Sequence, residues 1–264
     1  MFEFSENSVY SMPAHFGPLQ SGNPRAYRYD DVTSIMIVYE TDGDALAQFL
    51  PEGFEVTDPI LAISYEKCRA VDWMFGGQYN LIAVNVPVVY TRTPEPLAGF
   101  YALVVWENKT CPMLTGREAT GVPKVFADIE EHHQLGDYCF TNASYEGSRF
   151  LRLEIHRTQE MAAEEVAMRN QQPQLNWFGW RYIPNIGTSG AALSHATLFP
   201  QETIVKSGWH GEGAVQWDAL TREQHPLQAH IISALSRLPI GAHVRSEIVE
   251  KVAIGRSDLA RSLP

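Results

Sequence analysis

One lysine stands apart from the others in this chain. The sequence contains five lysines, and Lys124 is the one set in an apolar run, between Val122-Pro123 and Val125-Phe126. Burial disfavours the charged form of an amine, so a desolvated lysine can attack a carbonyl and form a Schiff base near neutral pH. The same pattern also fits an edge-strand lysine whose ammonium reaches solvent, which is the commoner fate of a lysine.

Polar side chains lie just before this lysine, within residues 116–124. In an extended segment Glu118, Thr120 and Lys124 would share one face, because side chains alternate along a strand. The Gly-Val-Pro sequence at 121–123 is expected to break that alternation. Glu118 is therefore either an acid–base group of a site around Lys124 or an ion-pair partner of Arg117.

The elements that must position these residues are mostly short strands. Apolar or alternating runs of five to nine residues recur along the chain, with turn residues between them. We predict strands over residues 34–40, 60–67, 81–89, 101–106, 125–129, 138–145 and 150–156. Such a series, without alternating helices, predicts a mostly β protein with a largely antiparallel sheet.

A few helices complete this α+β prediction. Residues 42–50 read as a short helix capped by Asp42 or Asp44 and stopped by Pro51. Residues 159–169 and 225–238 are two further predicted helices. No linker or repeat divides the chain, so we expect one domain over residues 1–264, with the Pro/Tyr-rich residues 1–30 as an arm packed on it.

Composition excludes several classes of partner. The net charge is −11 and the basic residues are scattered, so we expect no nucleic-acid or membrane partner. Three widely spaced cysteines, with no CxxC, indicate a reducing compartment, and the acidic N-terminus lacks a signal-peptide pattern. These features predict a cytoplasmic protein.

Common cofactor and metal motifs are missing from the sequence. There is no dinucleotide-binding GxGxxG, no P-loop and no GxSxG. The glycine-rich residues 208–213 lack such spacing and are predicted to form a hairpin loop. His132 and His133 would point to opposite faces of a strand, so we predict no metal site there and no cofactor.

At residues 116–124 the pattern G-R-E-x-x-G-x-P-K resembles the acetoacetate decarboxylase superfamily. Shorter matches follow in the same order along most of the chain: I-V-Y-E-T-D at 37–42, L-P-E-G-F-E at 50–55, G-F-Y at 99–101, I-P-N at 183–185 and L-P-I at 238–240. The resemblance implies a closed, cone-like antiparallel β-barrel with the lysine inside. It also implies that Lys124 forms the Schiff base and that the protein is a homo-oligomer.

The chain departs from that family at several site positions. Typical members carry a second lysine where this sequence has Val125, and a carboxylate-holding arginine where it has Val32. One family glutamate aligns with Ser64, with Glu66 as a displaced substitute. The other falls within residues 77–81, where the candidate substrate-binding residues are Gln78, Tyr79 and Asn80. Arg117, Thr120 and Trp106 complete the candidate substrate-binding residues, although Trp106 also suits a purely packing role.

These departures predict altered chemistry. Schiff-base formation needs only a nucleophilic amine, whereas loss of CO2 also needs the carboxylate held and then desolvated. We therefore predict a Schiff-base lyase acting on a small oxo acid or aldehyde, with aldol condensation and dehydration or retro-aldol chemistry. Lys124 and Glu118 are its predicted catalytic residues. The alternatives are a β-keto acid decarboxylase and a non-catalytic relative that binds a small carbonyl compound.

Overall fold

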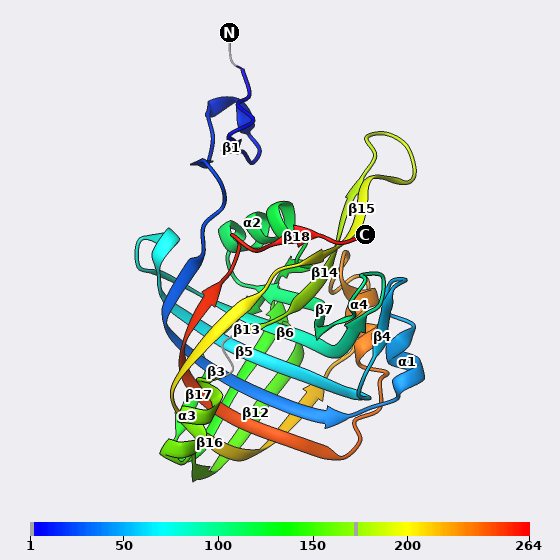
Figure 1. The fold of residues 1–264 in the computed structure, drawn as a ribbon. Helices are drawn as coiled ribbons and strands as arrows, with labels where there is room; N and C mark the ends of the chain where they lie inside the picture. The colour runs from blue at the N-terminus through cyan, green and yellow to red at the C-terminus, as the bar shows by residue number, and fades with distance from the viewer. Residues whose placement is uncertain (1–2, 172–173) are drawn as a thin grey trace.

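The computed structural model describes residues 3–171 and 174–264, and most of them lie in one large twisted sheet of 16 strands (Figure 1). A separate two-stranded sheet pairs β1 (Ser8–Val9) with β2 (Gln20–Ser21). The strands of the large sheet are β3 (Tyr27–Glu40), β4 (Phe54–Val56), β5 (Ile60–Val71), β6 (Gly77–Tyr90), β7 (Leu97–Glu107), β8 (Lys124–Phe126), β9 (Asp128–Ile129), β10 (His133–Leu135), β11 (Tyr138–Tyr145), β12 (Ser148–Glu160), β13 (Gln174–Leu175), β14 (Trp177–Pro184), β15 (Ala191–Leu198), β16 (Gln201–Trp217), β17 (His243–Gly255) and β18 (Arg261–Ser262).

The predicted mostly β fold with an antiparallel sheet is confirmed. The strand order is β10-β11-β12-β16-β17-β3-β5-β6-β7-β14-β15-β18, and the long neighbouring strands pair antiparallel. Two short parallel pairings, β7 with β8 and β7 with β14, occur at the far side of this path. Within the described residues the path does not join β10 to β18, so a closed barrel is not confirmed.

Alternation along the central strands gives the sheet two different faces. One face carries the main core, which includes Ile35, Ile63, Ile82 and Trp106. We call this the core face. The opposite face, which we call the lysine face, carries the smaller buried clusters and the strand-end acid Glu107. Its residues on β3, β5, β6 and β7 include Val32, Cys68, Tyr79, Ala83, Val105 and Glu107.

The helices are few and short. They are η1 (Ala14–Phe16), α1 (Gly43–Ala47), η2 (Asp72–Met74), α2 (Thr110–Thr120), α3 (Ala163–Arg169) and α4 (Ala229–Leu235). As predicted, Asp42 caps α1, and its carboxylate accepts a hydrogen bond from the Ala45 backbone N–H at 3.0 Å. Helices α3 and α4 fall within the predicted ranges and are shorter. In the described part of the chain, no helix is long and apolar enough to cross a bilayer.

The glycine-rich residues 208–213 are not a hairpin loop, so that prediction was wrong. They lie in the interior of β16, the longest strand of the sheet. A Cβ at Gly208 would lie 2.5 Å from the sulfur of Met161, and one at Gly211 would lie 2.6 Å from the His156 carbonyl oxygen. These glycines therefore permit close approach of neighbouring groups rather than a turn.

The N-terminal residues lie away from the body of the protein and join it as β3 (Figure 1). The segment with β1, η1 and β2 extends from the sheet at the end that also carries α2 and the β14–β15 hairpin (Figure 1). Strand β3 begins at Tyr27, so the last residues of the expected arm belong to the sheet. Within the extended segment, Met12 and Phe16 are more than four-fifths exposed.

Candidate active site around Lys124

The residues before Lys124 fold as helix, turn and strand rather than as one extended segment. Residues 110–120 form α2, and Gly121 ends the helix in the left-handed conformation with φ of +69°. Strand β8 then starts at Lys124 and pairs in parallel with β7, with Lys124 opposite Val105. This arrangement brings the lysine beside the carboxyl end of β7 and beneath α2.

The Lys124 amine forms an ion pair that the sequence analysis did not anticipate. Its Nζ lies 2.7 Å from Oε1 of Glu107, the last residue of β7. Nζ also donates a hydrogen bond to the Pro112 carbonyl oxygen, at 3.1 Å, in the first turn of α2. The Lys124 side chain is 14% exposed and that of Glu107 is fully buried. The expected burial of the lysine side chain is therefore observed.

The Glu107 carboxyl is in an unusual environment for an acid. Burial raises its pKa above the ordinary value of 4.5, while the adjacent Lys124 ammonium opposes that rise. Among the described residues, Lys124 is its one charged partner, and neither carboxylate oxygen has a hydrogen-bond donor apart from that ion pair. A carboxylate in this position is a stronger base than an exposed one.

Of the predicted site residues of α2, Arg117 contacts Lys124, whereas Glu118 and Thr120 bind other groups. Arg117 donates a hydrogen bond from Nη1 to the Lys124 carbonyl oxygen, at 2.7 Å, which fixes the backbone of β8. Glu118 accepts a hydrogen bond from the Ser11 hydroxyl in the N-terminal segment. Thr120 donates to the Gly116 carbonyl oxygen at 2.9 Å. It also lines a cleft of about 180 Å³ that Lys124 does not border.

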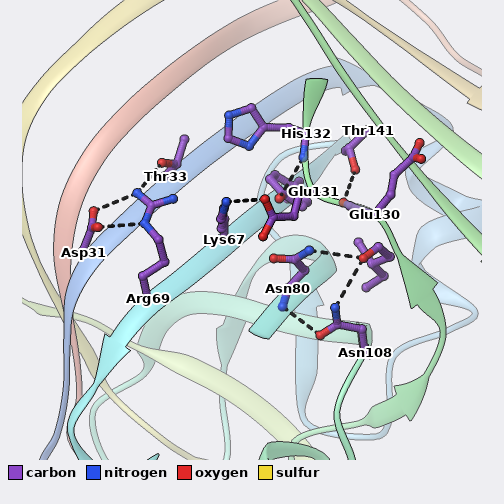
Figure 2. Close-up of polar contacts among 12 residues, drawn as sticks. Asp31, Thr33, Lys67, Arg69, Asn80, Asn108, Glu130, Glu131, His132 and Thr141 are labelled. Carbon is purple, nitrogen blue, oxygen red and sulfur yellow. Dashed lines mark hydrogen bonds and ion pairs between the residues drawn. The ribbon is translucent and has the colours of Figure 1, made fainter. Parts of the chain in front are cut away.

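The three polar candidates of β6 do not share one face. Tyr79 lies on the lysine face and is 3% exposed. Asn80 points the opposite way, and its side chain donates to the Ile129 carbonyl oxygen at 3.1 Å, in the polar network of Figure 2. Gln78 is exposed. Alternation along the strand therefore separates residues that sequence proximity had grouped together.

A second tyrosine joins Tyr79 on the lysine face. Tyr29 of β3 shares a hydrogen bond with Tyr79, and their ring centroids lie 6.4 Å apart. Burial raises the pKa of both phenols, and the Glu107 carboxylate adds to the rise. Both hydroxyls therefore stay protonated over the physiological range and can donate hydrogen bonds near the site.

The remaining candidate positions divide between the two faces. Trp106 lies in the main core, where its indole N–H donates to Gln228 at 2.8 Å. Val125 packs against the same core, on the side of β8 opposite the Lys124 amine. Val32 is fully buried on the lysine face. Ser64 is half-buried on β5, two residues before Glu66 and so on the same face as that acid.

Sequence reasoning missed Glu107 although a signal was present. An acid directly after the apolar run at residues 101–106 is unusual, because an unpaired carboxylate is costly to bury. Parallel pairing of β7 with β8 brings Glu107 to Lys124. Such pairing between separate segments cannot be predicted from a local sequence pattern. In the described part of the chain, no group of three or more His, Cys, Asp or Glu residues has metal-binding geometry.

Comparison with known proteins agrees with this geometry. The family model described as "Acetoacetate decarboxylase (ADC)" matches residues 11–252. An acetoacetate decarboxylase of Burkholderia multivorans is 26% identical over 215 residues, covering 81% of this chain and 79% of that protein. One of Burkholderia ambifaria is 25% identical over 235 residues, covering 88% of this chain and 87% of that protein.

Solved structures share the fold at lower identity. The acetoacetate decarboxylase of Legionella pneumophila superposes with a TM-score of 0.73 at 19% identity, covering 100% of this chain and 98% of that one. The enduracididine biosynthesis enzyme MppR, solved in complex with pyruvate, gives 0.69 at 17% identity, covering 98% of this chain and 99% of that one. With a family match over nearly the whole sequence and a buried lysine at the family motif, the chain belongs to the acetoacetate decarboxylase family.

Proposed function

We propose that this protein is a Schiff-base-forming lyase that acts on a small oxo acid through Lys124. The observation that carries the proposal is the contact of 2.7 Å between Lys124 Nζ and the fully buried carboxyl of Glu107. A lysine nucleophile must lose a proton before it attacks, and an adjacent base can accept that proton. Family membership supports lyase chemistry at the general level.

Proton transfer within the pair would generate the nucleophile. The ammonium–carboxylate pair and the amine–carboxylic acid pair both carry zero net charge, so transfer leaves no isolated buried charge. Burial raises the pKa of Glu107 and thereby favours the protonated acid. The neutral Nζ then attacks the carbonyl carbon, and the resulting carbinolamine loses water with a proton from Glu107. The product is an iminium whose positive charge the Glu107 carboxylate again balances.

The steps after the iminium distinguish the possible reactions. For a 2-oxo acid, loss of a proton from C3 gives an enamine, which attacks an aldehyde and then loses water. Hydrolysis releases the product and regenerates the amine. Two observations favour this route over decarboxylation. Val125, which stands where typical members have a second lysine, packs against the core. Val32, which stands where they have a carboxylate-holding arginine, carries no charge on the lysine face. The similar enzyme MppR has been solved with a condensation product of pyruvate and imidazole 4-carboxaldehyde.

Decarboxylation of a β-keto acid is the second candidate. In that reaction the iminium accepts the electron pair of the breaking carbon–carbon bond, CO2 leaves, and the enamine is protonated and hydrolysed. The similarity to acetoacetate decarboxylases of Burkholderia favours it. A relative that binds a small carbonyl compound without turnover is the third candidate. We also propose, for all three, a cytoplasmic homo-oligomer.

Borohydride trapping tests the proposal. The protein is incubated with pyruvate or acetoacetate and reduced, and the peptide that contains Lys124 is examined by mass spectrometry. We expect the reduced adduct on Lys124 in the unmodified chain and none in Lys124→Ala. Lys109→Ala, which removes an exposed lysine just before α2, is the matched control and should be trapped normally. No adduct with any carbonyl compound would overturn the Schiff-base proposal.

Steady-state assays then separate the two reactions. We expect condensation of pyruvate with an aldehyde, or its reversal, to be faster than CO2 release from acetoacetate. Rapid CO2 release that disappears in Lys124→Ala would assign the decarboxylase reaction instead. A trapped adduct with neither turnover would assign the non-catalytic binding role.

A further inference from the structure

The cleft of about 180 Å³ that Thr120 borders is lined mainly by basic and hydroxyl side chains. It lies between the end of α2, the β14–β15 hairpin and β18, which gather at one end of the molecule (Figure 1). The basic residues of its lining are Arg181, His195 and Arg261, and no Asp or Glu of the described chain lines it. The whole sequence has 31 acidic residues against 20 lysines and arginines, so this lining is a local concentration of positive charge.

Strand pairing explains why these side chains converge on one cleft. Arg181 of β14 lies directly opposite His195 of β15, and Thr197 of β15 lies directly opposite Ser262 of β18. Directly paired residues point to the same side of a sheet, and so do residues two positions apart on one strand. All four side chains therefore share one face of this part of the sheet.

The end of α2 forms one wall of the cleft. Gly179 of β14 lies opposite Thr197, and a Cβ at Gly179 would be 2.7 Å from the Gly121 carbonyl oxygen. A Cβ at Gly121 would in turn be 2.7 Å from Cβ of Arg181. These contacts seat the turn after α2 directly against β14, so the last residues of the helix stand beside the basic face.

Two polar groups of the lining have no partner in the described part of the chain. Nε of Arg181 is buried without an acceptor, and within residues 3–171 and 174–264 the guanidinium makes no ion pair or hydrogen bond. The hydroxyl of Thr197, a residue that is 4% exposed, is likewise buried without a partner among the described residues. Buried donors normally have an acceptor, and a buried charge without one is costly. The two groups therefore indicate an acceptor that the chain itself does not supply.

The carbonyl oxygens at the end of α2 are not that acceptor. The Gly121 backbone N–H donates to the carbonyl oxygens of Arg117 and Gly116, and the Thr120 hydroxyl also donates to that of Gly116. A guanidinium beside a helix C-terminus is favourable in itself. In the described structure, however, no carbonyl oxygen of α2 accepts a hydrogen bond from Arg181.

We infer that this cleft binds a small tetrahedral oxyanion, either inorganic phosphate or the phosphate group of a small metabolite. The fork of the Arg181 guanidinium suits two oxygens of such a group, and the hydroxyls of Thr197 and Ser262 can donate to others. Arg261 supplies a second positive charge. A carboxylate has two oxygens and one charge, so it would leave part of this donor set unused. The inference does not depend on the chemistry proposed for Lys124.

Titration calorimetry with inorganic phosphate tests the site in the full-length protein. We expect saturable binding to the unmodified chain and an affinity lower by about tenfold or more in Arg181→Met, as for loss of a hydrogen bond to a charged group. Thr197→Val removes a neutral donor and should lower the affinity by about threefold. Arg222→Met removes an exposed arginine that does not line the cleft and should leave the affinity unchanged.

Thermal unfolding gives a result that a purely structural role would not produce. Arg181 and Thr197 have no partner to lose among the described residues, so neither substitution should lower the Tm in a buffer without oxyanions. Phosphate should raise the Tm of the unmodified chain by mass action and leave that of Arg181→Met nearly unchanged. If Arg181→Met folds poorly, Arg261→Met replaces it, because Arg261 is exposed, with the same expected loss of phosphate binding.

Two further ligands distinguish the possible occupants. Glycerol 3-phosphate bound at least as tightly as phosphate would support a phosphorylated metabolite, and weaker binding would support free phosphate. Acetate bound as tightly as phosphate would overturn the assignment to a tetrahedral anion. No saturable phosphate binding, or equal affinities of the unmodified and Arg181→Met proteins, would overturn the site. A smaller assembly of Arg181→Met in light scattering, with phosphate binding unchanged, would assign the cleft to an acidic group of a second copy instead.

Discussion

Gly116 lies directly against the side chain of Lys124. A Cβ at Gly116 would be 2.6 Å from Cε and 2.9 Å from Nζ, closer than real side-chain contacts allow. The α2 backbone therefore forms one wall of the lysine's environment and confines the amine toward Glu107. This contact gives a physical reason for glycine at the start of the family motif.

Gly116→Ala should displace the Lys124 amine. The added methyl group would force Nζ away from Glu107, and misplacement of a nucleophile by about 1 Å can cost on the order of 100-fold in rate. We expect the rate of borohydride trapping with pyruvate to fall by about that factor. Gly255→Ala is the control, because its Cβ would have no neighbour closer than 4.0 Å. Equal trapping rates in the two variants would contradict the packing argument.

Glu107→Gln tests the base beside the lysine. Glutamine keeps the shape of the side chain and cannot accept the Lys124 proton, so we expect trapping to slow by about 100-fold, as for loss of a general base. Glu118→Gln alters the acid expected from the sequence, whose observed partner is Ser11, and should slow trapping by less than threefold. The pH dependence of trapping should also flatten in Glu107→Gln alone. A larger loss in Glu118→Gln would return the acid–base role to that residue.

His225 should make the fold sensitive to mildly acidic pH. Its ring is 2% exposed, neither nitrogen has a hydrogen-bond partner among the described residues, and it stacks on Tyr145 with centroids 3.9 Å apart. Burial lowers its pKa below the ordinary value of 6.5. The unfolded chain therefore binds a proton that the folded chain resists, so stability is lost as the pH falls through 6.5.

His225→Phe should remove that loss and keep the ring stacking. We expect about 1 kcal/mol of added stability at pH 7.5, because two unsatisfied buried nitrogens are removed, and a larger gain at pH 5.5. Thermal unfolding at both pH values measures it. His230→Phe changes an exposed histidine of α4 and should show no such pH dependence. A His225→Phe protein less stable than the unmodified one at pH 5.5 would show that the buried ring has a partner.

The N-terminal segment should form part of an oligomer interface. Phe16 is 83% exposed and Leu19 is 66% exposed, and large apolar side chains grouped on a surface usually mark an interaction site. We expect light scattering to show an oligomer for the unmodified chain and a smaller species for Phe16→Ser, Leu19→Ser. Leu135→Ser removes a similarly exposed side chain of β10 and should leave the assembly unchanged. A monomer in the unmodified chain would exclude the assembly.

The strands and the lysine were predictable because their signals are local. Alternating apolar residues gave β11 its observed bounds and gave β3, β5, β6, β7 and β12 a shorter version of theirs, whereas β14, β15, β16 and β17 were not predicted. The apolar flank of Lys124 indicated its burial. By contrast, α2 was not predicted, since its glycine and proline content and its weak apolar pattern do not indicate a helix. Its place against the lysine follows from tertiary packing.

The composition of the site depended on pairing between distant strands. Glu107 and Lys124 are 17 positions apart and meet through a parallel ladder, while the ion pair of Glu66 with Lys251 on the lysine face forms across β3. No local sequence pattern indicates such contacts. The prediction for the glycines of β16 was wrong for the same reason, because the groups that crowd them come from β3, β12, β17 and the residues that precede α3.

The charge balance of the lysine face affects how substrate reaches it. The two lysine–glutamate pairs of this face are Lys124 with Glu107 and Lys251 with Glu66, and each pair is neutral as a unit. Neither pair therefore offsets the net charge of −11 that an approaching anion meets at long range. The net charge of the protein repels an oxo acid at a distance, whereas a lysine attracts it at contact. Salt at 0.15 M weakens the first interaction more than the second, since it screens charges that are more than about 8 Å apart. Capture of an oxo acid should therefore become faster with increasing ionic strength, the reverse of an electrostatically steered enzyme.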